Sequence, residues 1–163
     1  MAELLCAVSA ARSSMECKIA RCFAFVGPHL PLDAHFAIGN FIRDAVTAGP
    51  IQIQGDGTPM RSYLYSADLA VWLWTLLFRA PSLRPFNVGS GKDLSIHQFA
   101  ETVAAAIRPG VEIRIARKAI PGESIQRYVP SVKRAKEELQ LTEGISLEDA
   151  VQRTAAWYRA YLD

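Results

Sequence analysis

The chain has 163 residues, of which 50% are hydrophobic and 21% charged, and its formal net charge is +2. This much apolar material can form a core for one domain and excludes an intrinsically disordered chain. The near balance of charge argues against a nucleic-acid or membrane partner, because such surfaces are usually strongly basic.

We expect neither a signal peptide nor a membrane span. The first residues lack a basic segment, and the most apolar run, 69–78, has about half the length that crosses a bilayer. That run predicts a buried core helix. Three cysteines, Cys6, Cys17 and Cys22, lack metal-ligand spacing, so buried thiols in a reducing, cytoplasmic compartment are expected.

The hydrophobic periodicity and the turn residues predict alternating helices and strands. In chain order these are a helix over 1–14, a strand over 18–26, a helix over 34–48, strands over 51–54 and 61–65, a helix over 67–79, a strand over 84–88, a helix over 96–107, a strand over 111–115, and two helices starting after Ser131 and at Ser146. This order is typical of an α/β fold.

Local signals refine these elements. Asp33 and Ser66 are candidate N-caps, while Ser95 and Ser146 each begin a capping box. The 18–26 run is apolar on both faces, which is typical of a central parallel strand, so Arg21 within it needs a partner. Asp68 is expected to favour the first turn of its helix.

The aromatic residues and histidines are assigned structural roles. Trp72 and Trp74 are expected in the core. His29, His35 and His97 share no metal-ligand spacing and are assigned to loops or helix surfaces. The Gly-x-Gly at Gly89 and Gly91 lacks the third glycine of a dinucleotide-binding turn.

Four stretches, in order, resemble the extended short-chain dehydrogenase/reductase family of nucleotide-sugar enzymes, and dTDP-glucose 4,6-dehydratases and sugar epimerases in particular. They are Arg21 to Pro28, similar to the strand that ends in an Asn-x-Tyr-Gly-Pro loop; Ile51 to Ala70, similar to Gly-Asp-Gly … Arg-Asp … Val-x-Asp-x-Ala; Phe86 to Gly91, similar to Tyr-Asn-Ile-Gly; and Pro121 to Leu139, similar to Pro-Gly … Arg-Arg-Tyr … Lys-Ala-x-x-Glu-Leu-Gly.

The resemblance implies one domain that is the carboxyl-terminal part of this fold. Residues 1–30 would be the last helix and strand of a Rossmann-type sheet, and residues 31–163 the substrate-binding portion. Met1 to Leu5 resembles the family's continuation after its catalytic Tyr-x-x-x-Lys. We therefore expect that pair, and the glycine-rich cofactor loop, upstream of Met1, and no catalytic residue or metal ligand in this chain.

Arginine suits a diphosphate because its planar guanidinium donates paired hydrogen bonds to phosphate oxygens. By resemblance, Arg61 matches the family arginine that contacts the diphosphate, and Arg127 matches a second one. The alternative for Arg61 is a solvated charge after a turn, and for Arg127 a surface ion pair.

An asparagine side chain both donates and accepts, as a phosphate or ribose contact requires, which favours this role for Asn87. A turn residue that bonds nearby backbone is the alternative. Gln52, Ile53 and Gln54 match the segment that lines the base in relatives, although either glutamine could instead face solvent. We expect Arg61 and Asn87 to face one shared cavity.

The resemblance therefore implies the substrate-binding portion of an NAD-dependent dehydratase or epimerase that acts on a dTDP- or UDP-hexose. NAD is expected in the complete enzyme and none in this chain alone, which should be inactive by itself. Ala24, Phe36 and Gly39 depart from the dehydratase pattern and leave the sugar and the reaction open.

A non-enzymatic nucleotide-sugar-binding or assembly module is the second hypothesis, and an unrelated α/β domain is the third. The reading frame upstream of Met1 distinguishes the first two. Apolar surface on the helix over 2–14 predicts a homodimer or higher oligomer.

Overall fold

The computed structural model describes residues 1–34 and 36–162; His35 lies outside the described residues. Its helices are α1 (Ala2–Arg12), α2 (Ala37–Val46), α3 (Ser66–Arg79), α4 (Ile96–Ile107), α5 (Lys133–Leu139) and α6 (Leu147–Leu162). Its strands are β1 (Ile19–Cys22), β2 (Phe25–Val26), β3 (Ile51–Ile53), β4 (Met60–Arg61), β5 (Leu64–Tyr65), β6 (Pro85–Val88), β7 (Leu94–Ser95), β8 (Ile113–Ile115) and β9 (Arg127–Tyr128).

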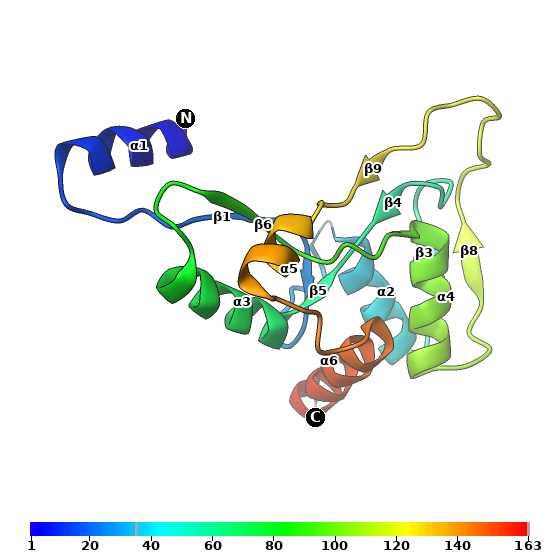
Figure 1. Cartoon of the computed structure of the whole chain (residues 1–163). Coiled ribbons are helices and arrows are strands. Elements are labelled where there is room, and N and C mark those ends of the chain that lie inside the picture. Colours follow the sequence, from blue (N-terminus) through cyan, green and yellow to red (C-terminus); the bar gives the residue numbers. More distant parts are fainter. Residues whose placement is uncertain (35, 163) are drawn as a thin grey trace.

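The strands form small, mostly parallel sheets (Figure 1). β1 pairs with β6, β2 with β5 and β3 with β8, all parallel, while β4 lies between antiparallel β7 and parallel β9. The strand expected over 18–26 is therefore two strands. The chain changes partner between them, because Phe23 N donates to Val88 O and Ala24 O accepts from Leu64 N.

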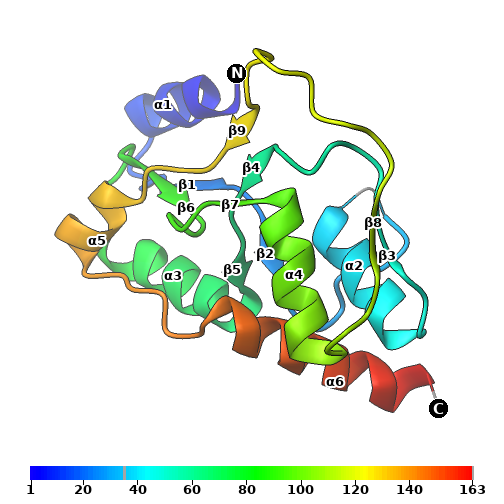
Figure 2. The ribbon, with the colours of Figure 1, turned by 90° about the vertical axis from the view of Figure 1, so that its right-hand side faces the viewer.

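Two clusters of buried side chains hold the fold together. In the first, α2, α4 and α6 pack around β3, and Phe41, Ile53 and Phe99 are among its buried residues. The second joins α3, α5 and β6 through Trp72, Phe86 and other apolar residues. α6 runs along one side of the molecule beneath the other helices, as Figure 2 shows.

Helix starts follow the sequence signals at some positions only. The Ser95 capping box of α4 is confirmed with both reciprocal hydrogen bonds, and Ser146 accepts from Asp149 N as expected. Asp33 is wrong as the N-cap of α2, which begins at Ala37, because Leu30 and Leu32 pack on the first core and keep the preceding segment out of the helix.

The start of α3 also differs from the expectation. Its N-cap is Tyr65, without a side-chain cap, so Ser66 does not have the capping role. Asp68 lies in the first turn as predicted, and its carboxylate also accepts from Gly144 N and Ile145 N at 3.1–3.2 Å. This contact ties α3 to the segment before α6.

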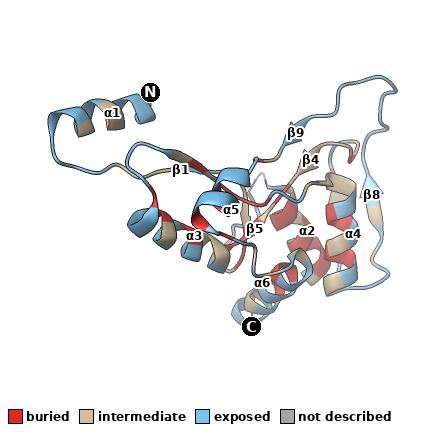
Figure 3. Ribbon diagram, viewed as in Figure 1, coloured by how far each residue is buried: buried red, intermediate tan, exposed pale blue. Residues whose placement is uncertain are grey.

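α3 is not the buried core helix that its composition predicts. Only Trp72 and Leu76 are buried, whereas a stripe of large apolar side chains on its other side is exposed. The stripe, which we call the α3 stripe, consists of Val71, Leu73, Trp74, Leu77 and Phe78. In Figure 3 much of α3 has the pale blue colour of exposed residues.

α1 has the predicted bounds to within two residues but carries no buried residue and stands apart from the other helices (Figures 1 and 3). Arg21, which was expected to be buried, is exposed instead, because β1 is covered on only part of its surface. Its partner is Glu3 of α1, which accepts from Arg21 Nε at 2.6 Å and from Nη2 at 2.8 Å.

The two described histidines have the expected structural roles. His29 is a loop residue whose ring packs against Trp157 in a tilted arrangement, with ring centroids 4.3 Å apart. His97 lies on α4 with its Nδ1 3.8 Å from Glu101. No group of three or more possible metal ligands occurs among the residues that the structure describes. Within the same residues, no helix combines the length and hydrophobicity of a membrane span.

Candidate functional site

A cavity of about 360 Å³ lies between α2, β3, the turn that follows β3, and β4. Four of the six predicted site residues line it: Gln52, Ile53, Gln54 and Arg61. Asn40 and Phe41 of α2 complete the wall opposite β3. The cavity thus combines amide groups, a ring and a guanidinium.

The strand β3 sets the orientation of the glutamine at the centre of this wall. Ile51 and Ile53 are buried in the first core, so Gln52 between them points the other way, as alternation along a strand requires. Gln52 N donates to the carboxylate of Asp44 at 3.2 Å, and Arg43 pairs with that carboxylate at 2.8 Å. These contacts hold β3 against α2.

The turn at one end of the cavity is held by its own side chains. Asp56 accepts from Thr58 N at 3.0 Å and from Thr58 Oγ1 at 2.9 Å, and these hydrogen bonds lower the pKa of the Asp56 carboxyl. Gly57 has φ +81°, in the left-handed region that favours glycine, and a Cβ there would come within 3.2 Å of His97 Cβ. The turn therefore has one well-defined shape.

Arg61 is held at the opposite end by β4, which is hydrogen-bonded on both edges to β7 and β9. Its Nη1 donates to Met60 O at 2.8 Å, which is the one hydrogen bond that its guanidinium makes within the described part of the chain. Arg61 is half-buried and lines the cavity, and its remaining donors have no partner among the described residues. A guanidinium in this state can bind an anion through two parallel hydrogen bonds.

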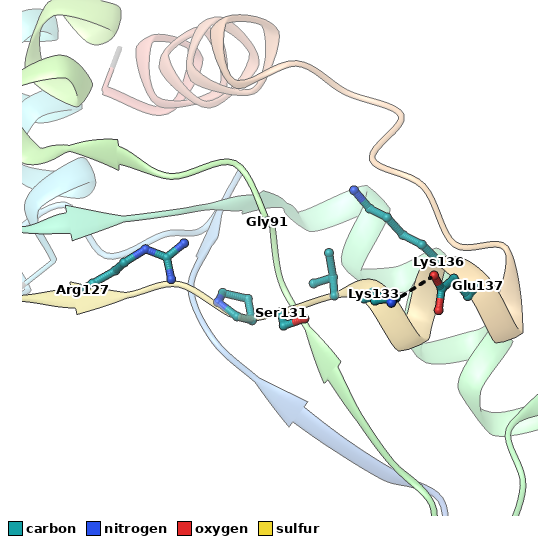
Figure 4. Close-up of a pocket in the computed structure, with 8 residues that line it drawn as sticks. Gly91, Arg127, Ser131, Lys133, Lys136 and Glu137 are labelled. Carbon is teal, nitrogen blue, oxygen red and sulfur yellow. Dashed lines mark ion pairs between the residues drawn. The ribbon is translucent and has the colours of Figure 1, made fainter.

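Asn87 and Arg127 lie elsewhere. Asn87 lines a hollow of about 440 Å³ over β6 and α5, and its Nδ2 donates to Ser131 O at 2.9 Å. Arg127 lines a second hollow of about 510 Å³ with Gly91, Lys133 and Lys136, drawn in Figure 4, and its Nε donates to Asp93 at 2.9 Å. The two hollows adjoin, since both include Ser131 and Lys133.

The expectation of one cavity shared by Arg61 and Asn87 is therefore wrong. The register explains why Arg127 is separated as well. Met60 lies opposite Arg127 and Arg61 opposite Tyr128, so the two arginines point to opposite faces of the β4–β9 pair. Arg127 forms a surface ion pair with Asp93, which was the alternative to a diphosphate contact. The hydrogen bond from Arg127 lowers the pKa of the Asp93 carboxyl.

A further part of the site was missed by sequence reasoning. The segment over 117–126 covers a cavity of about 650 Å³ that shares Gly55 and Pro59 with the first cavity. Gly55 O accepts from Arg117 N and Gln126 O accepts from Met60 N, so the segment is fastened at both ends. Arg117 and Lys118 add positive charge to this wall. Two adjacent basic residues shortly before Pro121 were the sequence signal that could have indicated it.

The described residues contain no glycine-rich turn of the kind that binds a dinucleotide. Its pyrophosphate requires a glycine-rich turn that opens directly into a helix. The glycines at 89 and 91 instead lead into β7, and those at 55 and 57 lead into β4.

Parallel strands joined through helices, with a polar cavity beyond β3 and β4, define a Rossmann-like α/β protein of the short-chain dehydrogenase/reductase type. The family model "NAD dependent epimerase/dehydratase family" matches residues 1–89. The chain belongs to this family, whose members in the comparisons include nucleotide-sugar decarboxylases, epimerases and dehydratases.

Two curated relatives illustrate the sequence similarity. UDP-glucuronic acid decarboxylase 6 of Arabidopsis thaliana is 32% identical over 82% of this chain and 40% of its own length. UDP-glucuronic acid decarboxylase 1 of Xenopus tropicalis is 28% identical over 100% of this chain and 38% of its own length. The chain thus spans well under half of these relatives.

Solved structures share the fold at lower identity. The UDP-glucose 4-epimerase of Thermotoga maritima, solved with UDP-glucose, has a TM-score of 0.85 at 19% identity and covers 99% of this chain and 52% of its own. The dTDP-glucose 4,6-dehydratase of Bacillus anthracis, in complex with NAD, has a TM-score of 0.80 at 17% identity and covers 98% of this chain and 50% of its own. The expected fold class is confirmed.

Proposed function

We propose that the chain binds a nucleotide-diphosphate sugar in the cavity between α2, β3 and β4. It would serve as the substrate-binding portion of an NAD-dependent nucleotide-sugar dehydratase or epimerase. The observation that carries the proposal is the convergence of Gln52, Ile53, Gln54 and Arg61 on one cavity. The family supports the substrate class.

Each group in the cavity has a chemical role in this proposal. The free donors of Arg61 bind the diphosphate, and the amides of Gln52 and Gln54 bond the edge of the base, with the buried side chains of Ile53 and Phe41 behind this wall. Asn87 and Arg127 position the neighbouring backbone through Ser131 and Asp93.

The complete enzyme would use NAD, which accepts a hydride from the sugar, and the cofactor would be held by a further half of the fold rather than by this chain. Two features support this division. β1 is paired along one edge only, which leaves its other edge open to a further strand. The α3 stripe is a second uncovered apolar surface, and contiguous exposed apolar surfaces commonly mark places where a further element packs.

Binding and catalysis can be tested separately on the purified chain. Isothermal titration calorimetry with UDP should show binding that Arg61→Ala weakens by roughly tenfold or more, since a hydrogen bond to a charged group contributes about 1.5–3 kcal/mol. Addition of NAD with UDP-glucose or UDP-glucuronic acid should give no turnover. Measurable turnover by the chain alone would contradict the proposed division.

We also propose a homodimer or higher oligomer formed through α1, whose exposed side chains include Leu4, Leu5 and Val8. Light scattering of the chain at micromolar concentration should give the mass of at least two copies. A single monomeric species would contradict this. The cytoplasm is the proposed location, because all three cysteines are free thiols.

A further inference from the structure

Cys6 and Cys17 lie in contact although ten residues separate them in the chain. Cys6 is on the middle turn of α1, and Cys17 precedes β1. Cys17 Sγ donates to the backbone oxygen of Cys6 across 3.6 Å. Both residues are half-buried, which leaves them reachable by small oxidants in solution.

The Cys17 thiol is the group that approaches Cys6. The pKa of the Cys17 thiol is raised, first by burial and then by the neighbouring Cys6. The contact between Cys17 Sγ and the Cys6 backbone brings the two residues close, as a disulfide between them requires. Cys22, by contrast, is exposed on β1, and its pKa is raised by burial alone.

Cys17 is fixed to the body of the molecule, whereas Cys6 is not. Ser82 Oγ accepts from Cys17 N at 3.1 Å, and Cys17 O accepts from Leu83 N at 2.8 Å. α1 has no buried residue, and its other side-chain tie is the exposed pair between Glu3 and Arg21. A covalent bond between Cys6 and Cys17 would therefore fasten α1 to the loop before β6.

We propose that Cys6 and Cys17 form a redox modification site, at which a low-molecular-weight disulfide converts the two thiols into an intramolecular disulfide. With glutathione disulfide, the thiolate of one cysteine attacks a sulfur of glutathione disulfide and releases one glutathione. The second cysteine then displaces the other glutathione. The two thiols lose two electrons and two protons, and glutathione disulfide becomes two glutathione molecules.

The site is independent of the nucleotide-sugar cavity, since neither cysteine lines that cavity. Its effect is mechanical: the bond closes the chain between residues 6 and 17 and holds the last turns of α1 over the start of β1. In a reducing compartment the thiols remain free, and the bond forms when the disulfide pool rises.

The test uses the full chain, incubated with excess glutathione disulfide, blocked with iodoacetamide and digested with trypsin. Arg12 lies between the two cysteines, so the expected product is the peptide of residues 1–12 joined to that of residues 13–18, separable by dithiothreitol. The intact chain should lose two hydrogen atoms in mass. Cys22→Ser should give the same joined peptides.

Cys6→Ser and Cys17→Ser should each stop at glutathione bound to the remaining thiol, with no loss of two hydrogen atoms. Recovery of unjoined peptides that carry glutathione on both Cys6 and Cys17 of the unaltered chain would overturn the proposal. So would a disulfide that involves Cys22 in place of either cysteine. The unaltered chain and Cys22→Ser decide the matter even if the other two variants do not fold.

Discussion

Trp72 and Trp74 are two residues apart on α3, yet Trp72 is 0% exposed and Trp74 is 62% exposed. Trp72 fills the second core, and its Nε1 donates to Thr142 O at 3.0 Å. Trp74 stacks on Phe78 instead, with ring centroids 5.6 Å apart, on the outer side of the helix. The two positions are about 200° apart around a helix, which accounts for the difference.

Replacement of these two tryptophans by alanine should have very different consequences for stability. Trp72→Ala removes a fully buried ring and should lower the free energy of unfolding by about 3–5 kcal/mol. Trp74→Ala removes exposed surface and should change it by no more than about 0.5 kcal/mol. Urea unfolding followed by circular dichroism measures both; equal losses would contradict the burial of Trp72.

Arg61 and Arg127 provide a matched pair for ligand binding. Arg61→Ala removes the free guanidinium of the cavity and should weaken UDP binding about tenfold or more, as a hydrogen bond between charged groups requires. Arg127→Ala breaks an ion pair on the opposite face and should leave UDP affinity within about twofold. Titration calorimetry measures both affinities. A larger loss of UDP affinity in Arg127→Ala than in Arg61→Ala would indicate that the anion site is the hollow beside Lys133.

Ser95 caps a helix and Ser66 does not, so alanine replacements of the two serines should differ in their effect on stability. Ser95→Ala removes an observed capping box and should cost about 1 kcal/mol of stability. Ser66→Ala should change stability by less than about 0.5 kcal/mol, because Ser66 makes no capping hydrogen bond. Chemical denaturation of both variants provides the comparison, and the reverse ranking would contradict the assigned N-cap of α3.

The contact between Glu3 and Arg21 predicts a pH-dependent position of α1. The hydrogen bond from Arg21 lowers the pKa of the Glu3 carboxyl in the folded chain. The stabilisation is therefore complete above the unfolded pKa, about 4.3, and is lost as the pH falls through the lower, folded pKa. NMR titration of the Glu3 carboxyl should show the lowered pKa, and Arg21→Ala should return it to the ordinary range; no change in that variant would contradict the pairing.

The sequence predicts most of the helices because their signals are local. The Ser95 capping box, for example, directly precedes α4 and involves only residues at the start of that helix. The exposure of Trp74 could not be predicted in this way, because an all-apolar helix does not indicate which side meets a core. The two-residue strands β7 and β9 were missed for a similar reason, since they exist only through their pairing with β4.

The candidate site likewise has a part that local sequence predicts and a part that depends on distant contacts. Gln52, Ile53, Gln54 and Arg61 occur within ten consecutive residues, so the strand and turn between them determine that they meet. Asn87 and Arg127 come from distant parts of the chain, and their place depends on the register between β4 and β9 and on α5. The order of motifs along the chain does not predict the register between β4 and β9.

The half-paired strand β1 and the α3 stripe have a practical consequence for work at the bench. An unpaired strand edge close to an exposed apolar helix surface favours aggregation. The isolated polypeptide should therefore bind hydrophobic dyes, adsorb to chromatography resins and recruit chaperones when overproduced. Charged replacements confined to Trp74 and Phe78 should make it easier to handle without disturbing the cavity between α2, β3 and β4.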